Sequence, residues 1–185
     1  MAVIKRNMKI STILLLVLVM AFDAGAQSYQ PSGDKSTVKF VIKNFGVNTG
    51  GDFKGLQGVI AWDAAEPEKT VFDISIDAAT VNTNTESRDN HLRKEDYFNV
   101  QQYPKIIFKS EKITVSGKSF TAYGKLSIKG TTKDISIPFT ATAKDGGYVF
   151  DGSFNINRRD FKVGGNSVVL SDNVTISLSV FAEKK

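Results

Sequence analysis

The stretch FTAYGKLSI, residues 120–128, decides the fold class of this chain. Apolar or small side chains occupy every second position from Phe120 to Ile128, and largely polar side chains occupy the positions between them. Successive side chains of a β-strand point to opposite faces of the sheet, so this period of two predicts a strand with one buried face.

The same alternation recurs on both sides of this stretch, and glycine-containing turns separate the runs. Short connections of this kind join antiparallel neighbours. About eight antiparallel strands with one apolar face each can close into a barrel or pair as a sandwich. The further runs cover residues 38–42, 60–62, 72–76, 106–108, 135–141, 150–156 and 174–180.

Small residues within the apolar stripes favour the barrel. Ala122 and Gly124 interrupt the stripe of residues 120–128, and Gly152 interrupts that of residues 150–156. A fully packed sandwich core would fill such positions, whereas small residues leave room for a ligand or for a bend in the strand. Both explanations of the glycines stay open. We therefore predict an all-β antiparallel barrel, wide enough for one small ligand.

Residues 88–108 form one charged island that does not alternate, and the island holds His91, the single histidine of the chain. Ser87 or Asp89 could cap a short helix over residues 90–97. We therefore expect one short helix near residues 88–97. We expect a segment that interrupts a regular sheet in this way to cap, gate or close one end of the structure that the sheet forms.

The first 26 residues have the pattern of a cleaved signal peptide. Lys5, Arg6 and Lys9 are followed by the apolar residues 10–22 and by the small-residue motif of residues 24–26. The apolar run is shorter than the ~20 residues that span a bilayer, so we prefer a cleaved leader to a retained anchor. The expected product is one domain, residues 27–185, in the periplasm or outside the cell.

Composition narrows the classes of function. The chain has no cysteine, which excludes disulfides, thiol catalysis, zinc–thiolate sites and a lipid anchor on cysteine. Loss of residues 1–26 removes three basic residues and one acidic residue, which lowers the net charge from +5 to +3. The lysines are scattered rather than clustered, so we expect no nucleic-acid partner, and we expect no stable membrane anchor.

At this point the chain resembles the YceI-like family of periplasmic polyisoprenoid-binding proteins. The order and spacing of the matching motifs carry the resemblance, since each motif alone is weak. The motifs are residues 36–40 (STVKF), 44–46 (NFG), 53–58 (FKGLQG), 76–83 (IDAATVNT), 88–92 (RDNHL), 97–98 (YF), 103–110 (YPKIIFKS), 124–133 (GKLSIKGTTK) and 157–161 (NRRDF).

The resemblance implies a lipocalin-like antiparallel barrel with a long apolar lumen for an isoprenoid chain, an isoprenoid quinone or a fatty-acid-like molecule. The chain departs from the family pattern at Asn44, where relatives often have histidine, and at the Phe45 that follows it. It also carries an extra basic residue, Arg159, and Lys162 where glycine is common. These departures concern the head group of the ligand rather than the fold.

An apolar lumen would bind a lipid tail by removing it from water, at ~0.8 kcal/mol per buried CH2. The candidate ligand contacts are the inward-facing residues of the stripes, each of which is also a core residue. They are Phe40, Ile42, Phe72, Ile74, Ile76, Phe108, Leu126, Ile128, Phe139, Phe154, Ile156, Ile176 and Leu178.

Five polar residues are candidates for a head-group site. Arg88, Asp89 and His91 could meet a head group at the barrel mouth, because arginine pairs phosphate or carboxylate in a bidentate manner. We favour the alternative in which these three satisfy one another and tie the helix to the barrel rim. Arg158 and Asp160 are likewise expected to form an ion pair rather than to contact a ligand.

The leading hypothesis is a non-enzymatic carrier or sequestering protein for an amphiphilic lipid, with no cofactor and no metal site. A lipid-modifying enzyme that uses His91, with Asp89 and a serine, is one alternative, but the sequence offers few catalysts. A β-domain that binds glycan or protein on its surface is another, and it would need Trp62 as an exposed aromatic platform. A homodimer through sheet edges or the barrel mouth also stays open.

Overall fold

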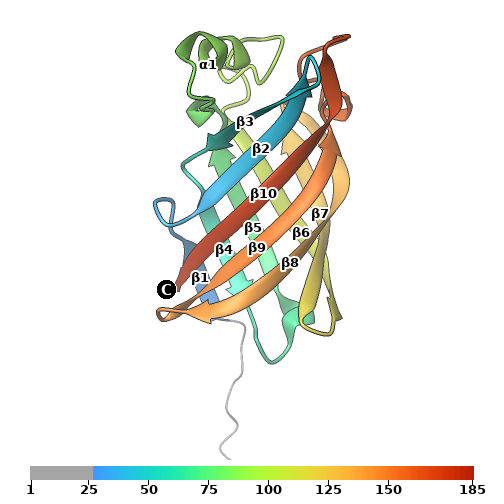
Figure 1. Cartoon of the computed structure of the whole chain (residues 1–185). Coiled ribbons are helices and arrows are strands. Elements are labelled where there is room, and N and C mark those ends of the chain that lie inside the picture. Colours follow the sequence, from blue (N-terminus) through green and yellow to red (C-terminus); the bar gives the residue numbers. More distant parts are fainter. Residues whose placement is uncertain (1–26) are drawn as a thin grey trace, which may run out of the picture.

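Antiparallel strands joined into one 10-stranded sheet dominate the computed structural model, which describes residues 27–185 (Figure 1). The signal peptide predicted for residues 1–26 lies outside the described residues. The strands are β1 (Gln27–Pro31), β2 (Thr37–Asn44), β3 (Val47–Phe53), β4 (Gln57–Trp62), β5 (Val71–Asp77), β6 (Lys105–Ser116), β7 (Ser119–Ile128), β8 (Thr131–Lys144), β9 (Gly147–Asn157) and β10 (Leu170–Lys184).

The sheet closes on itself through β10. One edge of β10 pairs with β9, and the other edge pairs with β2 over residues 170–179 and with β1 over residues 182–184. Since β1 also pairs with β4, a ring of eight strands runs from β1 through β4–β10 and back to β1. The predicted all-β antiparallel barrel of about eight strands is therefore confirmed.

The β2–β3 hairpin extends the wall toward one end of the barrel (Figure 1). Among the described residues, β3 has a ladder with β2 alone. Its other edge joins the rest of the molecule where Asp52 and Asn82 exchange two backbone hydrogen bonds, of 2.9 and 3.0 Å. The ring is thus complete near the C-terminus, and the hairpin forms the wall near the opposite end.

The stretch that decided the fold class forms β7, as its alternation predicts. Ala122, Gly124, Leu126 and Ile128 are buried, whereas Tyr123 and Lys125 between them are exposed. One face of the strand therefore points into the barrel and the other toward solvent. The same division holds along β4 and β8, where the inward positions are buried.

The glycines in the stripes let neighbouring strands bend and approach closely, and they do not leave room for a ligand. A Cβ on Gly124 would lie 2.2 Å from the carbonyl oxygen of Lys109, and the register of β6 against β7 shifts between Ser110 and Lys112. A Cβ on Gly152 would lie 2.8 Å from the oxygen of Pro138 on β8. Of the two explanations left open by the sequence, the bend with close backbone approach is the one observed.

The start of the charged island belongs to the α-helix α1 (Glu86–Leu92), which lies over the end of the barrel away from the C-terminus (Figure 1). We call this the helix end. The predicted short helix is confirmed, but its bounds differ from residues 90–97. Thr85 is the N-cap residue, so Ser87 and Asp89 lie inside the helix. The helix stops early because the chain reverses, with the Phe98 N–H bonded to the Leu92 carbonyl at 3.0 Å.

Three short 3-10 segments connect the strands: η1 (Pro67–Lys69), η2 (Ala78–Thr80) and η3 (Arg158–Phe161). η2 and η3 lie at the helix end. In each, an Asx side chain caps the first turn: Asp77 accepts from the Ala79 N–H at 3.0 Å, and Asn157 accepts from the Arg159 N–H at 2.9 Å. Alternation could not predict these segments.

Aromatic side chains fill the other end of the barrel, which we call the plugged end. Trp62 on β4 is 3% exposed, and its ring centroid lies 5.3 Å from that of Phe120, 5.6 Å from that of Tyr148 and 5.4 Å from that of Phe150. Most of these pairs are edge-to-face, which is a favoured geometry for aromatic rings. The barrel interior is therefore packed solid at this end.

No helix within residues 27–185 is long and apolar enough to cross a bilayer.

Candidate functional site

A cavity of about 380 Å³ occupies the barrel between the aromatic plug and α1. Side chains of strands β2 to β10 form its wall, and α1 with the turns beside it supplies the rest. Most of the lining side chains are aliphatic or aromatic. Polar lining residues lie on the strands and at the helix end. Those on the strands include Lys39, Thr49 and Ser75, and those at the helix end are Asn44, Thr83, Arg88, His91 and Arg158.

All of the candidate ligand contacts that alternation singled out line this cavity. Their contact with a ligand stays a prediction, but their position on the wall is a property of the fold. They are Phe40, Ile42, Phe72, Ile74, Ile76, Phe108, Leu126, Ile128, Phe139, Phe154, Ile156, Ile176 and Leu178.

Partial exposure of inward-facing residues shows that the protein does not fill this space itself. Ile176 and Leu178 point inward from β10, yet they are half-buried, as are Phe154 and Ile156 on β9. In a close-packed core such residues would be fully buried. Their residual exposure is the inner surface of the cavity, and it is apolar.

The structure adds wall residues that the strand pattern could not supply. Leu56 follows β3, Leu92 ends α1, Tyr97 and Phe98 follow in the turn, and Phe161 ends η3. All lie in loops or short helices, where no period of two exists. The motifs of residues 97–98 and 157–161 were the available signal, because they place aromatic residues outside the strands.

Arg88 and Asp89 are joined through Thr83 rather than directly to each other. Asp89, 7% exposed, accepts from the Thr83 N–H at 2.8 Å and from the Thr83 hydroxyl. Arg88 donates from Nε to the same hydroxyl at 2.8 Å and from Nη2 to the Thr83 carbonyl at 2.9 Å and the Thr85 hydroxyl at 3.1 Å. These bonds hold α1 to the barrel rim, but the expectation that Arg88, Asp89 and His91 bond to one another is wrong.

His91 stands apart from that network, at the boundary between cavity and solvent. It lines the cavity, is exposed, and packs against the Tyr97 ring with a centroid distance of 4.8 Å. Within residues 27–185 neither its imidazole nor the Tyr97 hydroxyl forms a hydrogen bond. The His91–Asp89 dyad of the enzyme alternative is therefore not assembled in this structure, since the Asp89 carboxylate is bonded to Thr83.

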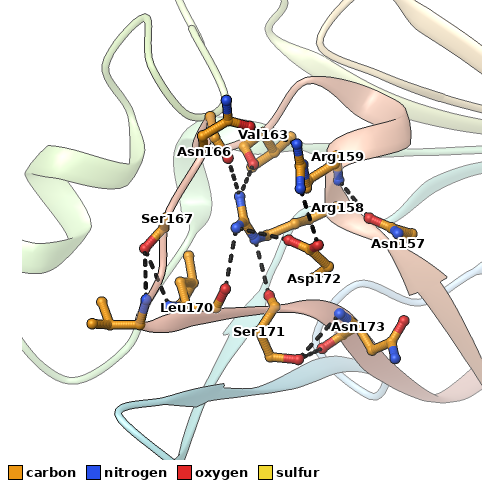
Figure 2. Close-up of polar contacts among 12 residues, drawn as sticks. Asn157, Arg158, Arg159, Val163, Asn166, Ser167, Leu170, Ser171, Asp172 and Asn173 are labelled. Atoms are coloured by element: carbon orange, nitrogen blue, oxygen red, sulfur yellow. Dashed lines mark hydrogen bonds and ion pairs between the residues drawn. The ribbon is translucent and has the colours of Figure 1, made fainter.

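Arg158 is buried at 3% exposure and has every N–H donor engaged (Figure 2). Nε donates to the Ser171 carbonyl at 2.9 Å, and Nη1 donates to the carbonyls of Val163 at 2.8 Å and Gly165 at 2.9 Å. Nη2 donates to the Leu170 carbonyl at 3.2 Å and to Asp172 Oδ1 at 3.0 Å. A guanidinium has five N–H donors, so this one has none left for a ligand.

The carboxylate paired with Arg158 is Asp172, which corrects the expected pair with Asp160. Asp160 is exposed on η3, three residues before Val163, and its side chain does not line the cavity. Asp172 also meets Arg159 Nη1 at 3.4 Å (Figure 2). The sequence separation of 14 residues between Arg158 and Asp172 gave no local signal for the pairing.

Burial shifts the pKa of one amine near the helix end. Desolvation lowers the pKa of Lys129, and Asp96 and Glu95 partly oppose this effect. The Lys129 ammonium donates to the Lys162 carbonyl at 2.9 Å, which ties the β7–β8 turn to η3. Lys129 is not part of the cavity wall, so this bond is structural.

The glycan-binding alternative loses its support within the described residues. Trp62 is buried in the plug, so it cannot act as an exposed platform for a glycan. Residues 27–185 contain no group of three or more His, Cys, Asp or Glu side chains placed to hold a metal ion.

Comparison with known proteins agrees with this architecture. The UPF0312 protein YE1254 of Yersinia enterocolitica is 29% identical over 178 residues, which cover 90% of this chain and 93% of the relative. The crystal structure of Burkholderia cenocepacia BcnA superposes with a TM-score of 0.78 at 27% identity, over 82% of this chain and 98% of that one.

A polyisoprenoid binding domain from Saccharophagus degradans, implicated in plant cell wall breakdown, superposes with a TM-score of 0.68 over 86% of this chain and 99% of that one. Its 16% identity shows a shared fold alone. The family model of the YceI-like domain matches residues 29–182, which is nearly all of the described chain. The chain therefore belongs to the YceI-like family.

Proposed function

We propose that this protein binds the tail of a long-chain amphiphilic lipid, such as a polyisoprenoid, an isoprenoid quinone or a fatty-acid-like molecule, in the barrel cavity. The observation that carries the proposal is the apolar wall of an unfilled space of about 380 Å³. Burial of a tail there gains ~0.8 kcal/mol for each CH2 removed from water, less the ordering costs of association. The polyisoprenoid binding domain of similar fold supports this ligand class.

The polar groups at the helix end favour a neutral head group. Arg158 has no free donor, and Arg88 is committed through Nε and Nη2 to Thr83 and Thr85. Arg88 Nη1 forms no hydrogen bond among the described residues, and neither do the Asn44 amide, the His91 imidazole and the Tyr97 hydroxyl. The last three combine donor and acceptor capacity when neutral, and they outnumber the one free cationic group. A hydroxyl or carbonyl head group satisfies such partners without the desolvation cost of a buried charge.

Binding without catalysis fits the same geometry. His91 is the single histidine of the chain, and neither a carboxylate nor a serine hydroxyl is hydrogen-bonded to it in residues 27–185. The proposed role is carriage or sequestration of the lipid outside the cytoplasm, as the pattern of residues 1–26 indicates. Recovery of a chemically unchanged lipid after prolonged incubation with the protein supports this role, and turnover contradicts it.

The first test is mass spectrometry of organic extracts from protein purified out of its native compartment. A stoichiometric prenyl or acyl species establishes the proposal and identifies the cargo.

The matched pair Leu178→Trp and Ser177→Trp then locates the binding site, because these neighbours on β10 face opposite sides of the wall. Leu178→Trp fills cavity space and is expected to weaken binding about tenfold or more, whereas Ser177→Trp leaves it unchanged. Equal binding by both variants would place the lipid elsewhere.

The head-group proposal has its own test. A fatty alcohol and the fatty acid of equal chain length bury the same tail, so their difference in affinity reports the head group. We expect the alcohol to bind more tightly near neutral pH, and His91→Ala to reduce that preference. Tighter binding of the carboxylate would overturn the proposal of a neutral head group and leave the tail site intact.

A further inference from the structure

The three most exposed large apolar side chains of the described chain lie together at the helix end. Phe45 is 76% exposed, Val47 is 67% exposed and Val168 is fully exposed. Phe45 and Val47 belong to the β2–β3 turn, and the Phe45 N–H donates to the Val169 carbonyl at 2.9 Å, which places that turn beside Val168. We call these three residues the rim patch. Figure 1 shows both segments at the top of the barrel, on the side away from α1.

Phe45 occupies a backbone position that disfavours it. The turn between Asn44 and Val47 has two residues with positive φ, Phe45 at 49° and Gly46 at 77°. Two-residue hairpin turns of this type prefer Asn, Asp or Gly at the first position, and a bulky residue there is an outlier. The equivalent turn between β8 and β9 has Asp145 and Gly146, with φ values of 47° and 78°.

A phenylalanine at this position thus carries both a backbone cost and the cost of an apolar ring in water. Such outliers persist at functional sites, where the exposed group serves an interaction. The rim patch also adjoins the cavity. Asn44 precedes Phe45 and pairs with Leu170 on β10, and both Asn44 and Leu170 line the cavity wall. Apolar surface therefore lies just outside the wall of the proposed lipid site.

The size of the rim patch and the charge of the residues around it indicate what kind of partner the patch contacts. Three such side chains on two loop tips expose at most a few hundred Å², well below the ~800 Å² per partner of a stable protein interface. Near the patch, the exposed basic residues are Lys43, Arg159 and Lys162, and the exposed acidic residue is Asp160, which leaves a net +2. The buried Arg158 adds nothing to this sum, because Asp172 pairs with it. A small apolar tip with basic flanks suits the interface of an anionic bilayer.

We propose that the rim patch inserts into the surface of an anionic lipid bilayer and positions the helix end of the barrel there, so that lipid passes between bilayer and cavity without crossing water. The proposal rests on the proposed function for the identity of the cargo, but docking itself can be measured without any cargo.

Vesicles of phosphatidylethanolamine with phosphatidylglycerol, floated on a density gradient with the purified protein, test the docking step. Phe45→Asn is the decisive variant, because asparagine suits the positive φ and the variant should fold at least as well. Combined with Val47→Thr and Val168→Ser, it is expected to lower vesicle partitioning about tenfold or more. The matched control is Val71→Thr with Val115→Thr, two exposed valines near the plugged end, and it should leave partitioning unchanged.

Three outcomes would overturn the proposal: equal partitioning of the rim variant and the wild type, loss of partitioning in the control variant as well, or partitioning that is equal on vesicles of phosphatidylcholine alone. A wild type that sediments as a dimer, with the rim variant a monomer, would assign the patch to a second copy of the chain instead.

A transfer assay separates this proposal from the proposed function. The initial rate at which a long-chain prenyl alcohol leaves the same vesicles for the protein should fall about tenfold in the rim variant. Equilibrium binding of that alcohol added from dilute ethanol should be unchanged, since the rim patch is not part of the cavity wall. No uptake by either protein refutes the proposed function, whereas equal transfer rates with normal uptake refute docking.

Discussion

The buried carboxylate of Asp89 accepts two hydrogen bonds from one residue, Thr83: one from its backbone N–H at 2.8 Å and one from its hydroxyl. The same hydroxyl accepts from Arg88. Thr83→Val keeps the shape and the backbone bond but removes the hydroxyl, so both charged side chains of α1 lose a partner. We expect a loss of about 1–3 kcal/mol in the free energy of unfolding, measured by urea denaturation.

The control for that variant is Ser87→Ala on the exposed side of α1, which should change stability by less than about 0.5 kcal/mol. Hydrogen exchange adds a local readout, because loosening of α1 should raise the exchange rates of residues 86–92 before those of the strands. Equal stability of Thr83→Val and the wild type would show that the network does not hold the helix.

Arg158→Lys tests the interpretation that this guanidinium is structural. A lysine ammonium has three donors in place of five and cannot reach the carbonyls of residues 163, 165, 170 and 171 together. Unsatisfied buried carbonyls and a weakened pair with Asp172 are expected to cost about 3–5 kcal/mol, measured by urea denaturation.

Arg159→Lys provides the comparison, because Arg159 is 51% exposed and meets Asp172 at the surface. It should cost less than about 1 kcal/mol. A stable Arg158→Lys protein with altered preference between charged and neutral lipids would instead assign Arg158 to the head-group site.

Gly124→Ala should disrupt the register shift between β6 and β7. The added methyl group would lie 2.2 Å from the Lys109 carbonyl oxygen, so the strands must separate locally. We expect destabilisation of about 1–3 kcal/mol by thermal or urea unfolding. Gly33→Ala is the reference: its Cβ has ordinary contacts, the nearest at 3.6 Å, and the substitution should be neutral or slightly stabilising. Similar effects at both positions would contradict this interpretation.

Trp62 offers a spectroscopic probe of the plug, because it is the single tryptophan of the chain. Its burial predicts a blue-shifted emission that acrylamide quenches poorly. Phe120→Ala removes a ring whose centroid lies 5.3 Å away and should increase quenching and destabilise the protein by about 3 kcal/mol. Phe120 does not line the cavity, so lipid binding should persist; strong quenching in the wild type would contradict the packed plug.

The cavity wall was predictable because strand geometry is local. A period of two assigns each side chain to one face whatever the partner strand, so Phe40, Phe72 and Leu178 could be placed inward from sequence alone. The closure of the ring was harder to predict from the sequence, because the pairing between residues 29–31 and 182–184 brings together opposite ends of the described chain.

The polar contacts at the helix end were only partly predictable, because they depend on which loops meet there. Arg158 and Asp160 are neighbours in sequence, but η3 carries Asp160 to the surface and the return of the chain brings Asp172 instead. Thr83 likewise gains its role from the fold of residues 83–89. Lys162 is a clearer case: it has φ of 57° at the end of η3, a left-handed conformation that glycine adopts most readily.

The closure of the barrel through β10 has a consequence for synthesis. A chain that leaves the ribosome N-terminus first presents β1 early, but β1 pairs with residues 182–184, which are synthesised about 150 residues later. The ring cannot form before residues 182–184 have been synthesised, and such long-range pairing is slow even afterwards. The strands made earlier therefore wait for this last partner with unpaired edges, so the incomplete barrel is the stage of synthesis most prone to pairing with other chains.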